Sequence, residues 1–177
     1  NVLTAHPSVP AKNLQELIAL AKAKPGAVNF ASTGVASVGH LTGELLNSLA
    51  GVKMTHVPYK GGGQAIIDLV GGHVQIMFSG FSAAMPHIKS GKIRALAVTG
   101  AARSPALAEV PTIAEQGFPG VEATAWYGML APTGTSKGVI TRVHGEVVRI
   151  LKLPDVTQRL GGRSEERRVG KECRSRW

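Results

Sequence analysis

The sequence predicts an α/β fold with a mainly parallel sheet that is covered by helices on both faces. Short apolar runs recur along the chain, each is followed by a glycine- or serine-rich turn, and segments with helical spacing separate them. The expected strands are residues 2–5, 27–31, 52–57, 74–78 and 93–98. Because parallel strands end at one edge of a sheet, the loops that follow them should gather there.

The expected helices follow from apolar stripes with a period near 3.6 residues. Asn13 opens the first, and Glu16 stands where it can complete a capping box. Within the part of the chain that holds the five strands, the expected helices are residues 14–21, 41–49, 65–70 and 82–88.

Beyond the last of these strands we expect an extended linker at 103–112, a short helix at 113–116 that Thr112 caps, and a long strand at 122–130 with Gly128 as a possible hinge. Two further helices are expected at 139–150 and 154–160.

The net charge of the 177-residue chain is +9, but part of it lies in an unusual tail. Residues 163–177 resemble the translation of a common sequencing adapter, so we treat this segment as an artefact. It carries six of the 20 basic and three of the 11 acidic residues, which leaves 14 against 8 and a charge of +6 for the body. The tail also holds Cys173, the one cysteine, so thiol catalysis, disulfides and cysteine metal sites are excluded for the body.

A positive body favours anionic partners, and nucleic acid is one class to consider. The lysines and arginines are scattered, aromatic residues make up only 5% of the chain, and no basic-aromatic repeat is present. A nucleic-acid groove needs both features, so we expect no nucleic acid partner. No run of about 18 apolar residues predicts a membrane span, and no signal peptide is visible in this sequence, which begins at Asn1.

The loop after the second expected strand has the composition of an anion site. Ser32, Thr33 and Ser37 supply hydroxyl groups, Gly34 permits close approach to the backbone, and a helix begins directly afterwards. The first amides of a helix lack partners within it, and its dipole makes that end positive. We expect a small carboxylate to bind there. The alternative is that these small residues only satisfy the sterics of a tight turn.

Two further loops should lie at the same edge. Tyr59 precedes a glycine-rich helix start and could stack on a ligand or hydrogen-bond it, whereas Lys60 beside it fits a solvated loop. Ser79 and Gly80 follow the fourth strand in the way that Ser32 follows the second. The predicted ligand-binding residues are therefore Ser32, Thr33, Gly34, Ser37, Tyr59, Ser79 and Gly80.

Catalytic patterns are absent from the sequence. It has neither a His-Glu-x-x-His helix nor a Gly-x-Ser-x-Gly elbow, and its acidic residues do not pair at catalytic positions. His40, in the first turn of the helix after the loop, could donate to a carboxylate or bond a nearby carbonyl. We therefore expect no enzyme activity, no catalytic residue, no metal and no cofactor.

Several runs of the sequence resemble the Bug family, the substrate-binding proteins of tripartite tricarboxylate transporters. The runs are Asn29-Phe30-Ala31-Ser32-Thr33-Gly34, Gly39-His40-Leu41-Thr42-Gly43-Glu44-Leu45, His56-Val57-Pro58-Tyr59-Lys60-Gly61-Gly62, Pro86 to Val98, Val110-Pro111-Thr112-Ile113-Ala114-Glu115-Gln116-Gly117 and Trp126-Tyr127-Gly128. The resemblance extends from Asn1 to about Leu160. Many relatives carry Asp-Asn where this chain has Ser79-Gly80.

The resemblance implies a type II periplasmic-binding-protein-like fold with two α/β lobes that close on a small organic carboxylate. It implies that residues 1–127 form the ligand-binding second lobe with hinge strands, that residues 128–162 return to the first lobe, and that the first half of the first lobe is missing. Its contacts with ligand carboxylates fall on Ser32, Thr33, Gly34 and Ser37, beside Ser79-Gly80. We expect this chain alone to bind ligand weakly or not at all.

The function that these observations favour is a monomeric periplasmic receptor that delivers a di- or tricarboxylate, an amino acid or an aromatic acid to membrane transporter subunits. An alternative is the effector-sensing domain of a transcriptional regulator, which has the same two-lobe architecture. A hydrolase or transferase would need a nucleophile and a base in the cleft, and the sequence offers no such pair.

Overall fold

The structure, a computed structural model, describes residues 1–124 and 128–156. The chain divides into two compact units, Asn1–Trp126 and Tyr127–Trp177, and each is described by itself below. This division lies one residue before the predicted boundary between residues 127 and 128, and the predicted domain roles stay a prediction. The predicted artefactual tail, residues 163–177, lies outside the described residues. The assignment of the second unit to another lobe stays a prediction.

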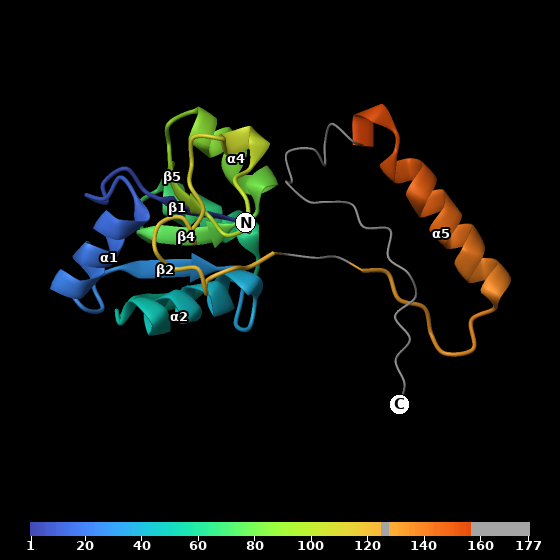
Figure 1. The fold of residues 1–177 in the computed structure, drawn as a ribbon, viewed down its shortest axis with the longest axis horizontal. Coiled ribbons are helices and arrows are strands. Elements are labelled where there is room, and N and C mark those ends of the chain that lie inside the picture. The colour runs from blue at the N-terminus through green and yellow to red at the C-terminus, as the bar shows by residue number, and fades with distance from the viewer. Residues whose placement is uncertain (125–127, 157–177) are drawn as a thin grey trace. The chain divides into compact units, whose positions relative to one another are not determined.

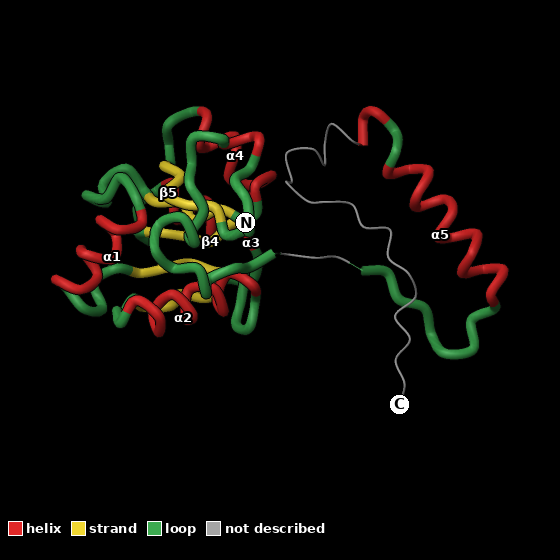
Figure 2. The backbone as a smooth tube through the Cα atoms, in the orientation of Figure 1, coloured by secondary structure: helices red, strands yellow, loops and turns green. Residues whose placement is uncertain are grey.

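The first unit is built on a five-stranded sheet with the order β3-β2-β4-β1-β5. Its strands are β1 (Val2–Ala5), β2 (Asn29–Ser32), β3 (Thr55–Pro58), β4 (Ile76–Ser79) and β5 (Arg94–Val98). β2 is parallel to both β3 and β4, whereas β1 lies between β4 and β5 and is antiparallel to both. The order β5-β1-β4-β2 can be followed in Figure 1, and Figure 2 shows the strands of this sheet in yellow. The sheet is therefore mixed, with β1 as the exception to the predicted parallel arrangement. A strand buried on both faces shows the same apolar run in either direction, so its pattern could not reveal this.

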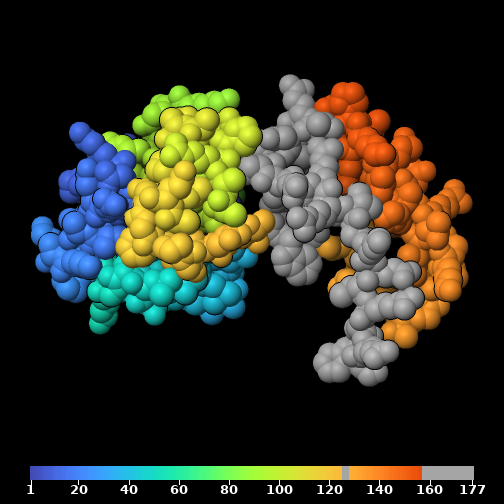
Figure 3. Space-filling model, viewed as in Figure 1, coloured from blue at the N-terminus to red at the C-terminus, as the bar shows by residue number. Residues whose placement is uncertain are grey.

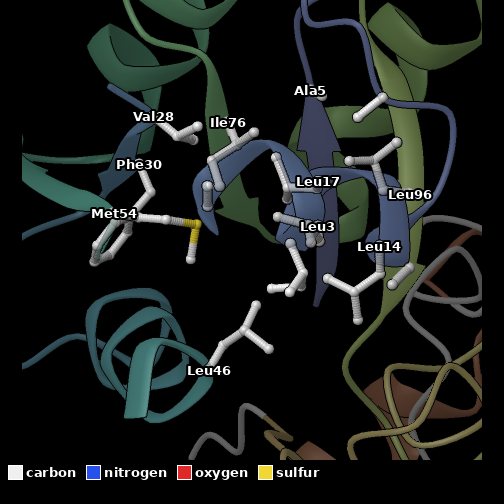
Figure 4. Close-up of a cluster of buried hydrophobic side chains, with 14 of the residues drawn as sticks. Leu3, Ala5, Leu14, Leu17, Val28, Phe30, Leu46, Met54, Ile76 and Leu96 are labelled. Carbon is white, nitrogen blue, oxygen red and sulfur yellow. The ribbon is translucent and has the colours of Figure 1, made fainter. Parts of the chain in front are cut away.

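Helices cover both faces of the sheet, as predicted. α1 (Leu14–Ala23) and α2 (Val38–Ala50) pack on one face, and α3 (Gly62–Val70) and α4 (Phe81–Lys89) contribute to the cluster on the other. The first face carries the larger cluster of buried side chains, in which Phe30, Met54 and Leu46 meet (Figure 4). This packing fixes α2 against the strands, and with it the helix end that follows the loop after β2.

The predicted capping box at the start of α1 is confirmed. The Asn13 side chain accepts a hydrogen bond from the Glu16 amide at 2.8 Å, and the Glu16 carboxylate reaches back to the Lys12 amide at 2.7 Å. Two otherwise unpartnered amides at the helix start are thereby satisfied.

Residues 99–124 run over the surface of the first unit, where they are yellow to gold in Figure 3. A short 3-10 helix, Pro105–Leu107, replaces part of the predicted linker. The predicted short helix at 113–116 is wrong, because these residues form turns. Thr112 and Glu115 do exchange two hydrogen bonds, from the Thr112 amide to the carboxylate and from the Glu115 amide to the hydroxyl. The capping signal was real, but a single turn follows it.

The predicted long strand at 122–130 is wrong for its described residues, which have no regular structure. Trp126 and Tyr127 lie outside the described residues. Ala123 exchanges bonds only with Thr99, whose backbone oxygen accepts from the Ala123 amide at 2.8 Å and whose hydroxyl donates to the Ala123 carbonyl at 2.6 Å. These two hydrogen bonds do not extend into the repeated pattern of a β-ladder. An apolar run becomes a strand only where a neighbouring strand pairs with it.

In the second unit, the predicted amphipathic helix is confirmed as α5 (Lys137–Leu151), which the Ser136 side chain caps. Its apolar face is exposed, with Val139, Ile140, Val143 and Ile150 each between 42% and 54% accessible. Residues 154–156 are helical, and the remainder of the helix expected at 154–160 lies outside the described residues. Among the described residues, no helix has the length and apolar character needed to cross a membrane.

Candidate anion-binding site

Three loops meet at one edge of the sheet because β3, β2 and β4 are neighbours that run in one direction. Ser32 pairs with Pro58 in the parallel register of β2 and β3, and Ala31 pairs with Met77 of β4. The ends of the three strands are therefore level. α2, α3 and α4 begin within a few residues of these ends, so three helix N-termini gather at one edge, as the sequence predicted.

The packing of two glycines brings the helix starts close to the strands. A Cβ added to Gly39, the second residue of α2, would lie 2.9 Å from the Phe78 carbonyl oxygen of β4. A Cβ on Gly62, the first residue of α3, would lie 3.5 Å from the Thr33 methyl group. Only glycine lets α2 approach β4 this closely, so the N-terminus of α2 is held beside the Ser79-Gly80 junction.

The amides of the loop after β2 fall into two groups. Three of them are satisfied by the loop itself, since the Gly34 amide donates to the Ser32 hydroxyl, that of Ala36 to the His40 ring and that of Ser37 to the Gly34 carbonyl. The amides of Thr33, Val35 and Val38 have no acceptor among the described residues. All three of those residues are exposed, with Val35 73% accessible. The loop therefore keeps three donors available to a ligand and uses the others to hold its shape.

The two predicted serines at the strand ends are buried and engaged by the protein. Ser32 is fully buried, and its hydroxyl lies 2.9 Å from the Gly34 carbonyl and 2.7 Å from His56 Nε2. The Ser79 hydroxyl lies 3.4 Å from that of Thr4 on β1, and Ser79 is only 1% exposed. The structure thus places Ser32 and Ser79 beneath the site, where the Ser32 hydroxyl braces the Gly34 backbone and the Ser79 hydroxyl meets the side chain of Thr4.

The remaining predicted residues lie at the surface of this edge or one layer below it. Thr33 and Gly80 are exposed, and Gly34 and Ser37 are half-buried. The Ser37 hydroxyl caps α2 by accepting from the His40 amide at 3.3 Å, which leaves its own proton free to donate. Gly80 begins α4 without a side-chain cap, so nothing of its own covers that helix start.

The Tyr59 side chain, which the sequence predicted to contact the ligand, is engaged by the protein itself. Its ring packs against the second core cluster, and its hydroxyl donates to an Asp68 carboxylate oxygen at 2.8 Å. Burial, aided by the hydrogen bond to Asp68 and by its negative charge, raises the pKa of Tyr59 to about 12. The structure therefore gives the Tyr59 hydroxyl a partner in α3, and the Tyr59 amide a partner in the Ser32 carbonyl at 3.1 Å.

Two histidines that the sequence did not assign to the site support the loop from below. The rings of His40 and His56 stack with their centroids 3.9 Å apart. His40 Nδ1 accepts from the Ala36 amide at 3.0 Å, so His40 bonds an amide and not the carbonyl that the sequence suggested. His56 was missed because it stands on β3, two residues before the strand end. The signal that could have found it is its register, which pairs it with Phe30 beside Ser32.

A shallow hollow of about 190 Å³ lies along α2 next to this edge. It is lined by Val38, Leu41, Thr42, Leu45, Glu122 and Ala123. The lining is mostly apolar, and Glu122 supplies its one charge. In the described part of the chain, no cluster of three or more His, Cys, Asp or Glu side chains could hold a metal ion.

Comparison with known proteins agrees with this arrangement. Residues 1–167 match the family described as the tripartite tricarboxylate transporter family receptor, TctC. The chain belongs to this family. The match covers nearly the whole sequence, and the resemblance inferred from the motifs is confirmed. The family is one of receptors, so the expectation that the chain is not an enzyme agrees with it.

Relatives and solved structures with similar sequences support the assignment. BugT of Bordetella pertussis (strain Tohama I) is 37% identical over 157 residues, which cover 89% of this chain and 48% of BugT. The structure of the periplasmic binding protein BugD superposes with a TM-score of 0.85 at 33% identity, over 91% of this chain and 54% of BugD. The expected periplasmic-binding-protein-like fold is thereby confirmed.

Two of the structural neighbours carry dicarboxylates. Rpa4515 of R. palustris, solved with adipate, has a TM-score of 0.85 and 36% identity, over 91% of this chain and 54% of its own. MatC (Rpa3494) from Rhodopseudomonas palustris, solved with malate, has a TM-score of 0.85 and 34% identity, over 91% and 55% of the two chains. The chain spans about half the length of the relatives and structures that it matches.

Proposed function

We propose that this TctC-family chain forms the ligand-binding lobe of a periplasmic solute receptor, which takes a small organic carboxylate and passes it to a tripartite tricarboxylate-type transporter. The observation that carries the proposal is the set of amides on the exposed residues Thr33, Val35 and Val38, between β2 and the first turn of α2, which have no acceptor in the described part of the chain. Amides at a helix N-terminus attract anions through hydrogen bonds and through the helix dipole. A carboxylate accepts from two or three such donors at once.

The predicted contacts take different roles in this proposal. Thr33, Ser37 and Gly80 bind the carboxylate directly, through amides and hydroxyls at the surface of the edge, whereas the Gly34 amide donates to the Ser32 hydroxyl and holds the turn. Ser32 and Ser79 act from beneath, since the buried Ser32 hydroxyl bonds the Gly34 backbone and the buried Ser79 hydroxyl meets that of Thr4. Tyr59 supports the site without touching the ligand, since its amide donates to the Ser32 carbonyl and its hydroxyl to Asp68.

The ligand class follows from the neighbours and from the charge of the chain. Adipate and malate in two structural neighbours are both small dicarboxylates. A body charge of +6 draws anions toward the lobe. A dicarboxylate places one carboxylate on the amides near Val38, and its apolar carbons lie toward the hollow that Leu41 and Leu45 line.

The proposed setting is the periplasm, as a monomer that docks on membrane transporter subunits. The family description names the transporter, and the neighbour BugD is a periplasmic binding protein. Closure of a second lobe over this edge would remove water from the carboxylate and strengthen its hydrogen bonds.

The test is an NMR titration of the ¹⁵N-labelled chain with adipate, with neutral adipamide as the matched ligand control. We expect millimolar adipate to shift the amide signals of Thr33, Val35 and Val38, and adipamide to leave them in place. A variant with Thr33→Pro, which removes one exposed amide, should weaken the response. Loop signals that stay fixed, or that move equally with adipamide, would overturn the proposed carboxylate site.

A further inference from the structure

The loop after β2 contains a strained residue that needs an explanation. Ala36 has a φ of +61° and is the one non-glycine residue among those described that adopts a positive φ. For an L-residue this left-handed conformation costs roughly 1–2 kcal/mol. Such strain persists only where neighbouring groups determine it, and it concentrates at functional sites.

The group that holds Ala36 is an imidazole. The Ala36 amide donates to His40 Nδ1 at 3.0 Å, and the His40 ring stacks on His56 at 3.9 Å with an interplanar angle of 22°. His56 in turn lies against the Phe30 ring at 5.0 Å, and its Nε2 lies 2.7 Å from the Ser32 hydroxyl. The two rings therefore connect the strained residue to the buried base of the same loop.

We propose that the stacked imidazoles of His40 and His56 are positioning groups, which hold Ala36 in its left-handed conformation and so keep the neighbouring amides of the loop available to a carboxylate. The inference extends the proposed carboxylate site and rests on it for the ligand, but its structural part concerns the loop alone. Neither ring is required to touch the ligand.

This clamp works in one protonation state. His40 Nδ1 accepts a hydrogen bond, so it carries no proton, and protonation there would set N–H against N–H at Ala36. Two charged rings at a centroid distance of 3.9 Å would also repel each other. The clamp therefore requires an acceptor at His40 Nδ1.

The charged surroundings of the pair agree with this. Glu44 of α2 is the ionised side chain recorded near the rings among the described residues, with its Oε1 4.0 Å from His40 Nε2. β2 contributes Phe30 and Ser32, which carry no charge. Burial lowers the pKa of His56, nearby His40 lowers it further, and Glu44 partly opposes the shift by raising it. The lowered pKa favours the neutral form of His56, which its stacking on His40 requires.

The experiment measures amide hydrogen exchange of Ala36 in the full chain without ligand, as a protection factor across pH 5 to 8. We compare three variants. His40→Phe keeps a ring for stacking and removes the acceptor, His40→Asn keeps an acceptor at the position of Nδ1, and His73→Phe is the control at an exposed histidine outside the loop.

We expect His40→Phe to lower Ala36 protection at pH 8 by roughly two- to tenfold, the range for one lost hydrogen bond. His73→Phe should match the unmodified chain across the pH range, and His40→Asn should keep more protection than His40→Phe because it retains an acceptor. Unchanged protection in His40→Phe, or protection in His40→Asn as low as in His40→Phe, would overturn the proposal. If adipate fails to bind, the carboxylate site fails, but this exchange result still decides the clamp.

Discussion

The contact between Gly39 and β4 gives a sharp test of how the site is assembled. A Cβ at position 39 would lie 2.9 Å from the Phe78 carbonyl oxygen, about half an ångström short of ordinary van der Waals contact. That oxygen belongs to a central strand, so relief must come from a shift of α2. Overpacking of a core costs about 1–3 kcal/mol. The better helix propensity of alanine returns up to about 1 kcal/mol. We therefore expect Gly39→Ala to lower the free energy of unfolding by roughly 1–2 kcal/mol.

The chain offers a matched control on the next helix. Gly63 is the second residue of α3, as Gly39 is of α2, but a Cβ there would meet nothing within 4 Å. Gly63→Ala should therefore leave stability unchanged or raise it by up to about 1 kcal/mol.

The assay is urea unfolding followed by far-ultraviolet circular dichroism. At a typical slope of about 2 kcal/mol per molar urea, Gly39→Ala should move the midpoint down by roughly 0.5–1 M. The same variant should weaken the amide shifts that adipate causes, because α2 no longer sits as close to β4. A Gly39→Ala protein as stable as Gly63→Ala would refute the argument that this contact sets the position of the helix.

Three further predictions concern the loop and its support. Ala36→Gly removes the left-handed strain and should raise the unfolding free energy by roughly 0.5–1 kcal/mol in urea titrations. Leu46→Ala empties a fully buried position on α2 and should cost about 2–5 kcal/mol by the same assay, whereas a loss below 1 kcal/mol would contradict the core assignment. The pKa of Tyr59 is raised to about 12 in the folded state against an ordinary value near 10. The neutral Tyr59 hydroxyl, which burial and the hydrogen bond to Asp68 favour, therefore stabilises the fold fully below pH 10, and this contribution is lost as the pH rises to 12, so the alkaline loss of stability should shrink in Tyr59→Phe.

The sequence predicted the five strands of the sheet, the helices α1 to α5 and the edge where the loops meet because these depend on local signals, but its predicted helix at 113–116 was wrong. Asn13 and Glu16 gave the cap, and the apolar runs gave the strands to within a few residues. Strand direction was not predictable for β1, since an apolar run carries no sign of its direction. The expected strand at 122–130 failed for a related reason, because pairing depends on a neighbouring strand that local sequence does not specify.

The sequence predicted which residues lie at the candidate site, but it predicted only some of their contacts. A serine at the end of a strand supplies a hydroxyl group. Whether that hydroxyl faces a ligand or the sheet depends on which face of the sheet the residue points to and on the residue opposite it on the neighbouring strand. Ser32 and Ser79 both face inward, toward His56 and Thr4. His56 entered the site through cross-strand register, which spacing along one chain segment does not encode.

The division of the loop into satisfied and available amides has an energetic meaning. A loop that orders only when a ligand arrives loses conformational entropy at that moment, which weakens binding. Here the amides of Gly34, Ala36 and Ser37 are already bonded to the loop and to His40, so the backbone is ordered before any ligand binds. The internal bonds therefore do not compete with recognition. They fix the directions of the Thr33, Val35 and Val38 amides. The left-handed conformation of Ala36 is the strain that this short turn needs to leave three amide donors without an internal partner.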